Sequence, residues 1–352
     1  MKVGIIGAGA IARRGHLPVC RNLPGIEIAA IADVNLELAR DVAEEFSIPK
    51  YFCSVEDLLK DESIDMIDIC TPTQTHLDVV KQVTKKGKNV LIEKPLATCL
   101  EEALMIQKYV KDNGVKLCVV QNYRYFSAVS QAKRRIKEGY IGNIVSIHGF
   151  GITSFPSHWT LNPWLYHKGG ALYDFGPHII DMTLLMKDFV PVKTVFAFGG
   201  DFSKGNMDFI NYSSILLEFE DGSTAVVDIS WVTGTNFKFL LDIYGTGGNL
   251  VLDVRNNVTS ENHGFATPID DTRAYLKKMY KIGTGVLNGS FFTGSNEFYA
   301  PLFLDFMDAI NGKKEIPVPV EQGILTSAVL EATERSIREK QPIKIKDLLH
   351  EF

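Results

Sequence analysis

The feature that most restricts the fold of this chain is a glycine-rich turn close to its first residue. An apolar run at residues 2–6 leads into Gly7-Ala8-Gly9-Ala10-Ile11-Ala12, and a helix expected to end near residue 22 follows. In this G-x-G-x-x-A pattern the first glycine permits a tight turn and the second lets the backbone approach a pyrophosphate. The pattern is more specific for dinucleotide binding here because a predicted strand precedes it and a predicted helix follows it. We therefore predict a dinucleotide-binding turn, with Gly7, Gly9, Ala10 and Ile11 as cofactor contacts.

Strands and helices are predicted to alternate through the first third of the chain. Apolar runs typical of buried strands lie at residues 2–6, 26–32, 66–70, 89–93 and 116–120, and segments with helical spacing lie between them. Strands separated by helices of this length favour right-handed βαβ units and a parallel sheet covered on both faces. We predict an α/β fold here, a doubly wound Rossmann domain over residues 1–121.

The pattern changes after residue 121. A helix is predicted at residues 127–138, and strands with period-two alternation are predicted at residues 144–150, 192–198, 214–219, 224–231, 237–244 and 250–254. Asp221-Gly222 between two of these strands indicates a hairpin. Further helices are predicted at residues 298–310 and 324–339. We predict an α+β domain with a large, mostly antiparallel sheet over residues 122–352, which binds substrate and forms oligomers.

Composition excludes several classes of protein. The 352 residues are 45% hydrophobic and carry a net charge of −5 without a long basic run, so a nucleic-acid partner is not expected. No apolar stretch is long enough to span a bilayer, and glycines break up the apolar start of the chain, which argues against a signal peptide. The five cysteines form no C-x-x-C pair. We expect reduced thiols in a cytoplasmic protein.

Asp33 ends the second predicted strand and bears on the choice of cofactor. A carboxylate at this place would accept hydrogen bonds from the adenosine ribose hydroxyls and would repel a 2′-phosphate. No arginine follows immediately, since the next residues are Val34, Asn35 and Leu36. We therefore expect NAD rather than NADP. An aspartate that only caps a helix is the alternative interpretation.

The strand at residues 89–93 ends in Glu93-Lys94-Pro95. Pro95 disfavours the right-handed helical conformation at Lys94, so the lysine is expected to stay extended where the strand ends. Ligands of an open parallel sheet bind outside the carboxyl ends of its strands, and an ammonium there is placed to meet a substrate. A surface lysine at a strand end is the alternative.

A loop after the strand at residues 66–70 reads Thr71-Pro72-Thr73-Gln74-Thr75-His76. We interpret it as the nicotinamide side of the crevice, with Thr71, Pro72 and His76 as cofactor contacts beside Glu93 and Lys94. In the alternative interpretation the threonine is an ordinary helix cap and His76 lies at the surface.

A second polar motif, Asp174-Phe175-Gly176-Pro177-His178, lies between the later strands. In a helix Asp174, His178 and Asp181 would share one face, and Pro177 would be tolerated only in the first turn. An aspartate beside a histidine can orient its ring for general acid/base chemistry. A core histidine in a buried network is the alternative. Nearby residues lack metal-ligand spacing, so we expect no metal site.

The glycine turn, the E-K-P motif and the D-x-G-x-H motif together resemble the Gfo/Idh/MocA oxidoreductase family, over nearly the whole chain. The resemblance implies that Lys94 and His178 flank the nicotinamide and the reacting carbinol, and that Asp174 binds substrate hydroxyls. Two departures concern substrate fit: the helix entry reads Lys168-Gly169-Gly170-Ala171 where many members have three glycines, and no proline follows Arg124 where members commonly have one.

The resemblance also implies an NAD-dependent dehydrogenase that acts on a secondary hydroxyl of a sugar, a sugar derivative or a cyclic polyol. His178 would be the general base, and Lys94 would stabilise negative charge on oxygen. Arg124, Tyr125 and Trp164 are predicted as further substrate contacts. Two alternatives remain: a glycosidase or lyase of the same fold that uses bound NAD transiently, and a non-catalytic protein that senses NAD or a sugar.

A homodimer or homotetramer through the second domain's sheet is also predicted. The period-two strands carry apolar residues such as Val226, Ile229 and Trp231, which must be buried somewhere. A partner subunit would cover a sheet face that helices leave open.

Overall fold

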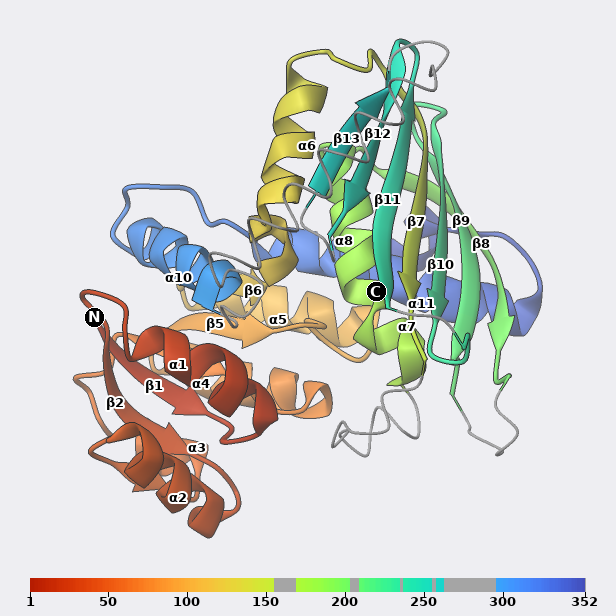
Figure 1. Ribbon diagram of the computed structural model, residues 1–352. Helices are drawn as coiled ribbons and strands as arrows, with labels where there is room; N and C mark the ends of the chain where they lie inside the picture. Colours follow the sequence, from red (N-terminus) through yellow and green to blue (C-terminus); the bar gives the residue numbers. More distant parts are fainter. Residues whose placement is uncertain (155–168, 203–208, 235–236, 255–257, 263–295, 352) are drawn as a thin grey trace. The chain divides into compact units, whose positions relative to one another are not determined.

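The computed structural model describes residues 1–154, 169–202, 209–234, 237–254, 258–262 and 296–351 (Figure 1). The chain forms two compact units. Unit 1 consists of Met1–Asn122 and Gly294–Ser327, and unit 2 consists of Tyr123–Thr293 and Ala328–Phe352. The first boundary lies close to the predicted one at residue 121. The return of residues 294–327 to unit 1 was not part of the prediction.

Unit 1 contains a six-stranded parallel sheet in the order β3-β2-β1-β4-β5-β6. The strands are β1 (Lys2–Ile6), β2 (Glu27–Ala32), β3 (Tyr51–Phe52), β4 (Met66–Ile69), β5 (Asn89–Glu93) and β6 (Leu117–Val120). All five predicted strands are present, and β3 was missed. The order reverses direction at β1, as in a doubly wound fold, so the Rossmann prediction is confirmed.

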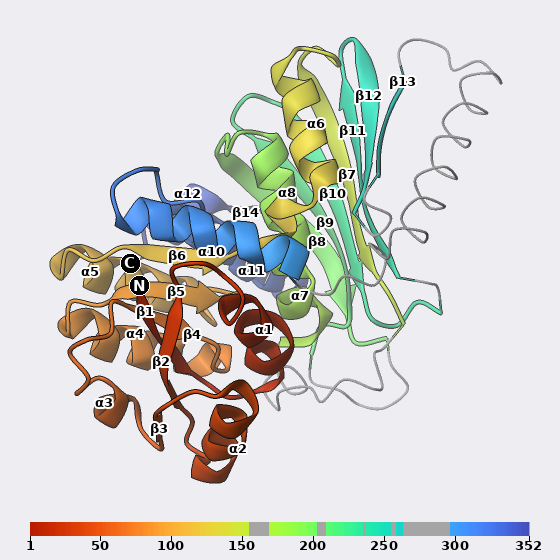
Figure 2. The ribbon, with the colours of Figure 1, turned by 60° about the vertical axis from the view of Figure 1, so that its left-hand side comes forward.

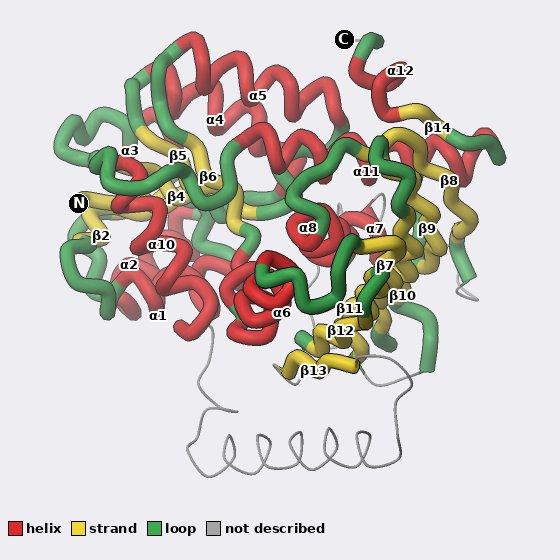
Figure 3. The backbone as a smooth tube through the Cα atoms, turned by 90° about the horizontal axis from the view of Figure 1, so that it is seen from above, coloured by secondary structure: helices red, strands yellow, loops and turns green. Residues whose placement is uncertain are grey.

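The helical segments of unit 1 are η1 (Ala12–His16), α1 (Leu17–Cys20), α2 (Leu36–Phe46), α3 (Val55–Leu58), η2 (Thr73–Thr75), α4 (His76–Lys85), α5 (Leu100–Asp112) and α10 (Asn296–Ile310). Seen from above, α1 and α10 lie on one side of the sheet, and α4 and α5 lie on the other (Figure 3). Strands β4 and β6 are buried along their whole length, and β1 and β5 are buried except at their first residues, because both faces of the sheet are covered.

Helix α10 returns from the far end of the sequence to pack beside α1 in unit 1 (Figure 2). Tyr299 and Phe303 of this helix are buried. The Lys116 ammonium donates hydrogen bonds to the last carbonyls of α10, at Ala309 and Ile310. Cations are favoured at the carboxyl end of a helix, where carbonyl groups lack intrahelical partners.

Unit 2 is built on an eight-stranded sheet in the order β13-β12-β11-β7-β10-β9-β8-β14. The strands are β7 (Ile144–Ile152), β8 (Val192–Gly200), β9 (Tyr212–Phe219), β10 (Thr224–Ser230), β11 (Lys238–Gly245), β12 (Gly248–Asp253), β13 (Val258–Asn262) and β14 (Ile343–Lys344). Neighbouring strands are antiparallel except β7 and β10. Asp221 and Gly222 form the tight β9–β10 turn, so the hairpin prediction is confirmed.

The remaining helices are η3 (Asn122–Tyr125), α6 (Ser127–Lys137), α7 (Gly170–Asp174), α8 (Gly176–Met186), α11 (Val320–Glu339) and α12 (Ile345–Leu349). Helices α6, α7 and α8 cover one face of the unit 2 sheet. Gly149 and Gly151 of β7 lie under α8, where a Cβ at either position would approach Ile179 or Phe175. The missing side chains therefore let the helix pack close to the sheet.

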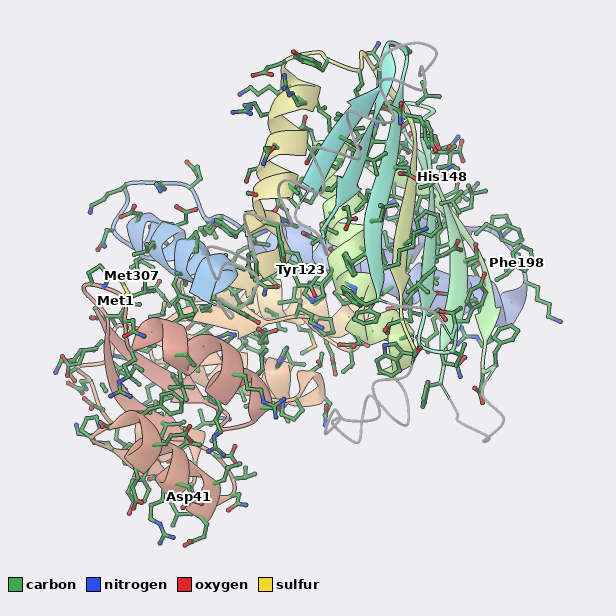
Figure 4. All side chains as sticks on the ribbon, in the orientation of Figure 1. Met1, Asp41, Tyr123, His148, Phe198 and Met307 are labelled. Carbon is green, nitrogen blue, oxygen red and sulfur yellow. The ribbon has the colours of Figure 1, made fainter. Side chains whose placement is uncertain are left out.

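No helix of the described residues covers the other face of the unit 2 sheet, here called the open face (Figure 3). It carries alternate residues of the strands, among them the half-buried His148 and the exposed Phe198, both labelled in Figure 4. Of the apolar residues that suggested an oligomer, Ile229 and Trp231 are fully buried inside unit 2, and Val226 lies half-buried on the open face.

Candidate functional site

The glycine turn leads from β1 into the helical segment formed by η1 and α1. Gly7 has a φ of +99°, and a Cβ there would lie 2.7 Å from the carbonyl oxygen of Cys70, so only glycine fits. At Gly9 a Cβ would meet nothing within 4 Å. Gly9 therefore presents bare backbone next to a helix start, which is the arrangement that a pyrophosphate requires.

Asp33 follows β2 and is tied to the glycine turn. Its Oδ2 accepts a hydrogen bond from the Ala8 N–H at 2.8 Å, and its Oδ1 accepts one from the Asn35 N–H at 2.9 Å. A carboxylate offers about four acceptor positions, so each oxygen can accept one more donor. The residues present therefore fit a dinucleotide whose ribose hydroxyls donate to a carboxylate already held in place.

Lys94 lies at the carboxyl end of β5, as the motif predicts, and is half-buried. The Lys94–Pro95 peptide bond is cis. The Glu93 side chain folds back so that its Oε2 accepts a hydrogen bond from the Lys94 N–H at 3.0 Å. Strands β4 and β5 are paired in parallel, so their carboxyl ends lie together. The loop that starts at Thr71 therefore lies at the same end of the sheet as Lys94.

His76 contacts two loops at this end of the sheet. Its ring is fully buried, with Nδ1 3.1 Å from the carbonyl oxygen of Leu96 and Nε2 3.1 Å from that of Thr71. Burial lowers the pKa of His76, and the two carbonyls oppose this effect only in part. The lowered pKa favours a neutral ring, which can donate to only one of the two carbonyls at a time. The ring lies between the two loops, and its role as a cofactor contact stays a prediction. Thr71 is half-buried and Pro72 is exposed.

Sequence reasoning missed a buried cluster around His16. The imidazole is fully buried, with Nδ1 2.8 Å from Asp68 Oδ2 and Nε2 2.8 Å from Glu93 Oε1. Burial by itself lowers the pKa of His16, but the charge of Asp68, the nearby Cys70 and their hydrogen bonds together raise it well above its usual value. Asp68 was the available signal, because an acidic residue inside an apolar strand needs a buried partner.

His16, Asp68 and Cys70 also place three potential metal ligands within 4.8 Å of one another. The 2.8 Å between the His16 and Asp68 atoms is a hydrogen-bond length, whereas two ligands of a tetrahedral zinc ion lie about 3.4 Å apart. Burial raises the pKa of the Cys70 thiol to about 12, so it stays protonated. We interpret the group as a hydrogen-bonded cluster.

In unit 2, Asp174 ends α7 and His178 lies in the first turn of α8, with a break at Phe175 between the two helices. Pro177 therefore sits where a helix tolerates proline. The His178 ring is 7% exposed and stacks on Tyr123, with ring centroids 4.1 Å apart and 7° between the planes. Burial, and secondarily the Asp174 charge, raise the pKa of Tyr123.

Asp181, the third member of the predicted polar face, is bound by Arg124. Arg124 Nε donates to Asp181 Oδ2 at 2.7 Å, and Nη2 donates to Oδ1, which makes a bidentate ion pair. Both side chains are almost fully buried. This ion pair gives Arg124 a structural role, and a substrate contact of Arg124 stays a prediction. Tyr125 is half-buried, and Trp164 lies outside the described residues.

A six-stranded doubly wound sheet with this turn, and with an acid at the end of β2, defines a dinucleotide-binding protein of the Rossmann type. The chain belongs to the GFO/IDH/MocA oxidoreductase family. The family's model for the NAD-binding Rossmann fold matches residues 1–121, and the model for the GFO/IDH/MocA C-terminal domain matches residues 129–251. The predicted family and fold class are therefore confirmed.

Curated relatives span similar lengths. The chain is 28% identical over 290 residues to levoglucosan dehydrogenase of Pseudarthrobacter phenanthrenivorans, covering 72% of this chain and 73% of that protein. It is 27% identical over 350 residues to inositol 2-dehydrogenase of Rhizobium meliloti, covering 98% and 99%.

Solved structures share the fold. The levoglucosan dehydrogenase complex with NADH gives a TM-score of 0.81 at 22% identity and covers 98% of this chain and 99% of that one. The WlbA dehydrogenase from Bordetella pertussis, in complex with NADH and UDP-GlcNAcA, gives a TM-score of 0.82 at 21% identity, covering 98% and 97%. Among the described residues, no helix has the length and apolarity needed to cross a membrane.

Proposed function

We propose that this protein is an NAD-dependent dehydrogenase that oxidises a secondary hydroxyl of a sugar or cyclic polyol. The observation that carries the proposal is the position of Lys94 in unit 1. This lysine stands at the carboxyl end of β5, in the same sheet whose β1 and β2 end in the glycine turn and Asp33. An ammonium at that sheet edge is suited to stabilise charge on a substrate oxygen.

The preference for NAD over NADP rests on Asp33. The pinned carboxylate keeps one acceptor position on each oxygen for the ribose hydroxyls, and its charge would repel a 2′-phosphate. The residues that follow carry no positive charge before Arg40. Arg40 pairs with Glu37 on α2, so its charge is already balanced locally.

His178 is proposed as the general base and Lys94 as the group that stabilises the developing oxyanion. A bound nicotinamide would supply the hydride acceptor. The stack on Tyr123 fixes the plane of the His178 ring, so a ring nitrogen keeps one direction towards a substrate hydroxyl. Asp174, half-buried one turn before His178, is proposed to accept hydrogen bonds from substrate hydroxyls.

A screen for NAD reduction tests the proposal. Purified protein is mixed with NAD and a panel of aldoses, sugar acids, anhydrosugars and inositols, and absorbance at 340 nm is followed. Bound cofactor is identified by mass spectrometry after denaturation. Stoichiometric NADH formation supports the dehydrogenase. Substrate conversion without net NADH would instead support a lyase or glycosidase, and binding without conversion would support a sensor.

We further propose that the open face of the unit 2 sheet forms the contact of a homo-oligomer. Leu216 and Phe198 are exposed on this face, and Val226 and Phe196 beside them are half-buried. A contiguous apolar surface of this kind is costly in water. Sedimentation at micromolar concentration should give at least twice the monomer mass, and a 39.2 kDa species would contradict the proposal.

A further inference from the structure

A chain of hydrogen bonds connects His16, in the helical segment that the glycine turn opens, to the backbone of Lys94. His16 belongs to the helical segment that the glycine turn opens, four residues after Ala12. Its Nε2 contacts Glu93 Oε1, and the other oxygen of Glu93 accepts the Lys94 N–H. A single carboxylate thus links the imidazole to the backbone of the next residue.

Both ring nitrogens of His16 face carboxylates. Ionised Asp68 and Glu93 offer only acceptors, so both hydrogen bonds are satisfied together when each ring nitrogen carries a proton. Such charge-assisted bonds are roughly twice as strong as neutral ones. Without a cation between them, two buried carboxylates on neighbouring strands would repel, and one would have to take up a proton or turn away.

The surroundings of His16 seal this arrangement from water. Tyr299 of α10 lies at a ring-centroid distance of 4.9 Å and Phe303 at 5.6 Å, the latter edge-on. The titratable groups that surround the ring are Asp68 and Cys70 from β4 and its end, Glu93 from β5, Cys20 from α1 and Tyr299 from α10. Burial raises the pKa values of both thiols, so neither thiol adds a negative charge beside the ring.

We propose that His16 is a positioning residue, a buried imidazolium that holds Glu93 and, through it, the backbone of Lys94 in register with the glycine turn. The inference rests on the catalytic role proposed for Lys94. If Glu93 were released from His16, its carboxylate would no longer hold the Lys94 N–H. The backbone position from which the Lys94 side chain extends towards the substrate would then no longer be fixed. A reactive ammonium must be placed to within a fraction of an ångström.

The protonation state is tested by NMR on ¹⁵N-histidine-labelled protein, with His16 assigned from the signal lost in His16→Gln. Both ring nitrogens should carry protons at pH 8. In Glu93→Gln the amide keeps an acceptor for the Lys94 N–H but turns its donor towards the ring, so Nε2 of His16 should lose its proton. A wild-type His16 that is a neutral tautomer at pH 8 would overturn the proposal.

Hydrogen exchange tests the link to Lys94. The Lys94 amide should exchange at least tenfold faster in His16→Gln than in the wild type. Cys20→Ala is the matched control, because it removes packing beside the same imidazole and leaves the chain of bonds intact, so exchange should change less than twofold. Equal rates in His16→Gln and wild type would overturn the link. Neither measurement uses a substrate, so both stand apart from any failure of the proposed activity.

Discussion

The ring of His178 lies flat against the ring of Tyr123, with centroids 4.1 Å apart and planes 7° apart. Phe126 and Phe239 meet the Tyr123 ring edge-on, at 5.2 Å and 5.0 Å, and so hold it in turn. Because burial and the Asp174 charge raise the pKa of Tyr123, the phenol stays neutral under His178. The plane of the proposed base is therefore held by an aromatic face.

Substitutions at Tyr123 should separate stacking from hydroxyl chemistry. Tyr123→Phe keeps the ring, and kcat should stay within threefold of the wild type. Tyr123→Leu removes the stack and lets the His178 ring rotate, so kcat should fall by roughly 10- to 100-fold, the loss expected from misplacing a catalytic group. Steady-state kinetics with a substrate from the NAD-reduction screen measure both. Equal losses in the two variants would assign the effect to the hydroxyl.

Arg124 is predicted to matter for stability more than for substrate affinity. Its bidentate pair with Asp181 is almost fully buried, and removing one partner of such a pair costs about 3–5 kcal/mol because the other charge is left unpaired. Arg124→Met should lower the free energy of unfolding in urea by that amount. Lys193→Met, which breaks an exposed pair with Glu218 in the same unit, should lower the free energy of unfolding far less, because water screens that pair.

The competing role for Arg124 gives a different pattern. If its guanidinium binds substrate, Arg124→Met raises KM many-fold with little effect on unfolding. The double variant with Asp181→Asn should be less destabilised than the sum of the single variants, because neither charge is then left alone.

Two buried histidines, His16 and His76, should change the free energy of unfolding in opposite directions as the pH rises. The pKa of His16 is raised on folding, so its stabilisation is complete below about pH 6.5 and is lost as the pH rises through the folded-state pKa. The pKa of His76 is lowered, so its contribution is complete above about pH 6.5 and is lost as the pH falls.

Thermal unfolding from pH 5 to pH 9 measures these contributions. The Tm deficit of His16→Gln relative to wild type should shrink as the medium becomes more alkaline. The deficit of His76→Gln should shrink as the medium becomes more acidic. Parallel pH profiles for the two variants would contradict the assignment of charges.

The sequence predicted the elements of unit 1 where apolar periodicity is strong. Apart from β3, the strands of the parallel sheet appear in the sequence as short apolar runs, because helices cover both faces of the sheet. Strand β3, only two residues long, has no such run and was missed. The packing of α10 in unit 1 could not be predicted either. An apolar helix face indicates that the helix is buried, but it does not show which element the helix packs against.

The candidate site was predictable only where a motif is local. Helical spacing placed His178 and Asp181 on one face, but the partner of Asp181 is Arg124, 57 residues away along the chain. His16 likewise meets Glu93 across 77 residues. Such pairs form when strands and helices come together in space, so spacing within one element cannot show them. A buried acid such as Asp68 signals only that some partner exists.

Asp33→Ser should change cofactor preference. The substitution removes a charged acceptor, and a hydrogen bond to a charged group contributes about 1.5–3 kcal/mol, so NADH should bind roughly 10- to 150-fold more weakly. NADPH binding should weaken far less or improve, since repulsion of the 2′-phosphate is gone. Fluorescence titration with both cofactors measures this. A wild type that already prefers NADPH would contradict the role given to Asp33.

Lys94→Met is the most direct test of the proposed chemistry. Methionine keeps an unbranched apolar stem and removes the charge and the donor. Turnover should fall by about 10²–10⁴, the range for losing a positioned proton-transfer or charge-stabilising group. NADH should bind within threefold of the wild-type affinity, because Asp33 and the glycine turn are unchanged. Since the loss lies in the transition state, kcat should drop more than KM rises.

Lys88→Met is the matched control for this prediction. Lys88 precedes β5 at the opposite end of the same strand, and its ammonium donates to the carbonyl oxygen of Glu62 at the surface. Its turnover should stay within twofold of the wild type. His178→Asn should resemble Lys94→Met, and the double variant should lose less than the product of the two losses if both groups serve one proton pathway. A Lys94→Met enzyme with turnover within a few-fold of wild type would make Lys94 an ordinary strand-end lysine, and the proposed mechanism would be wrong.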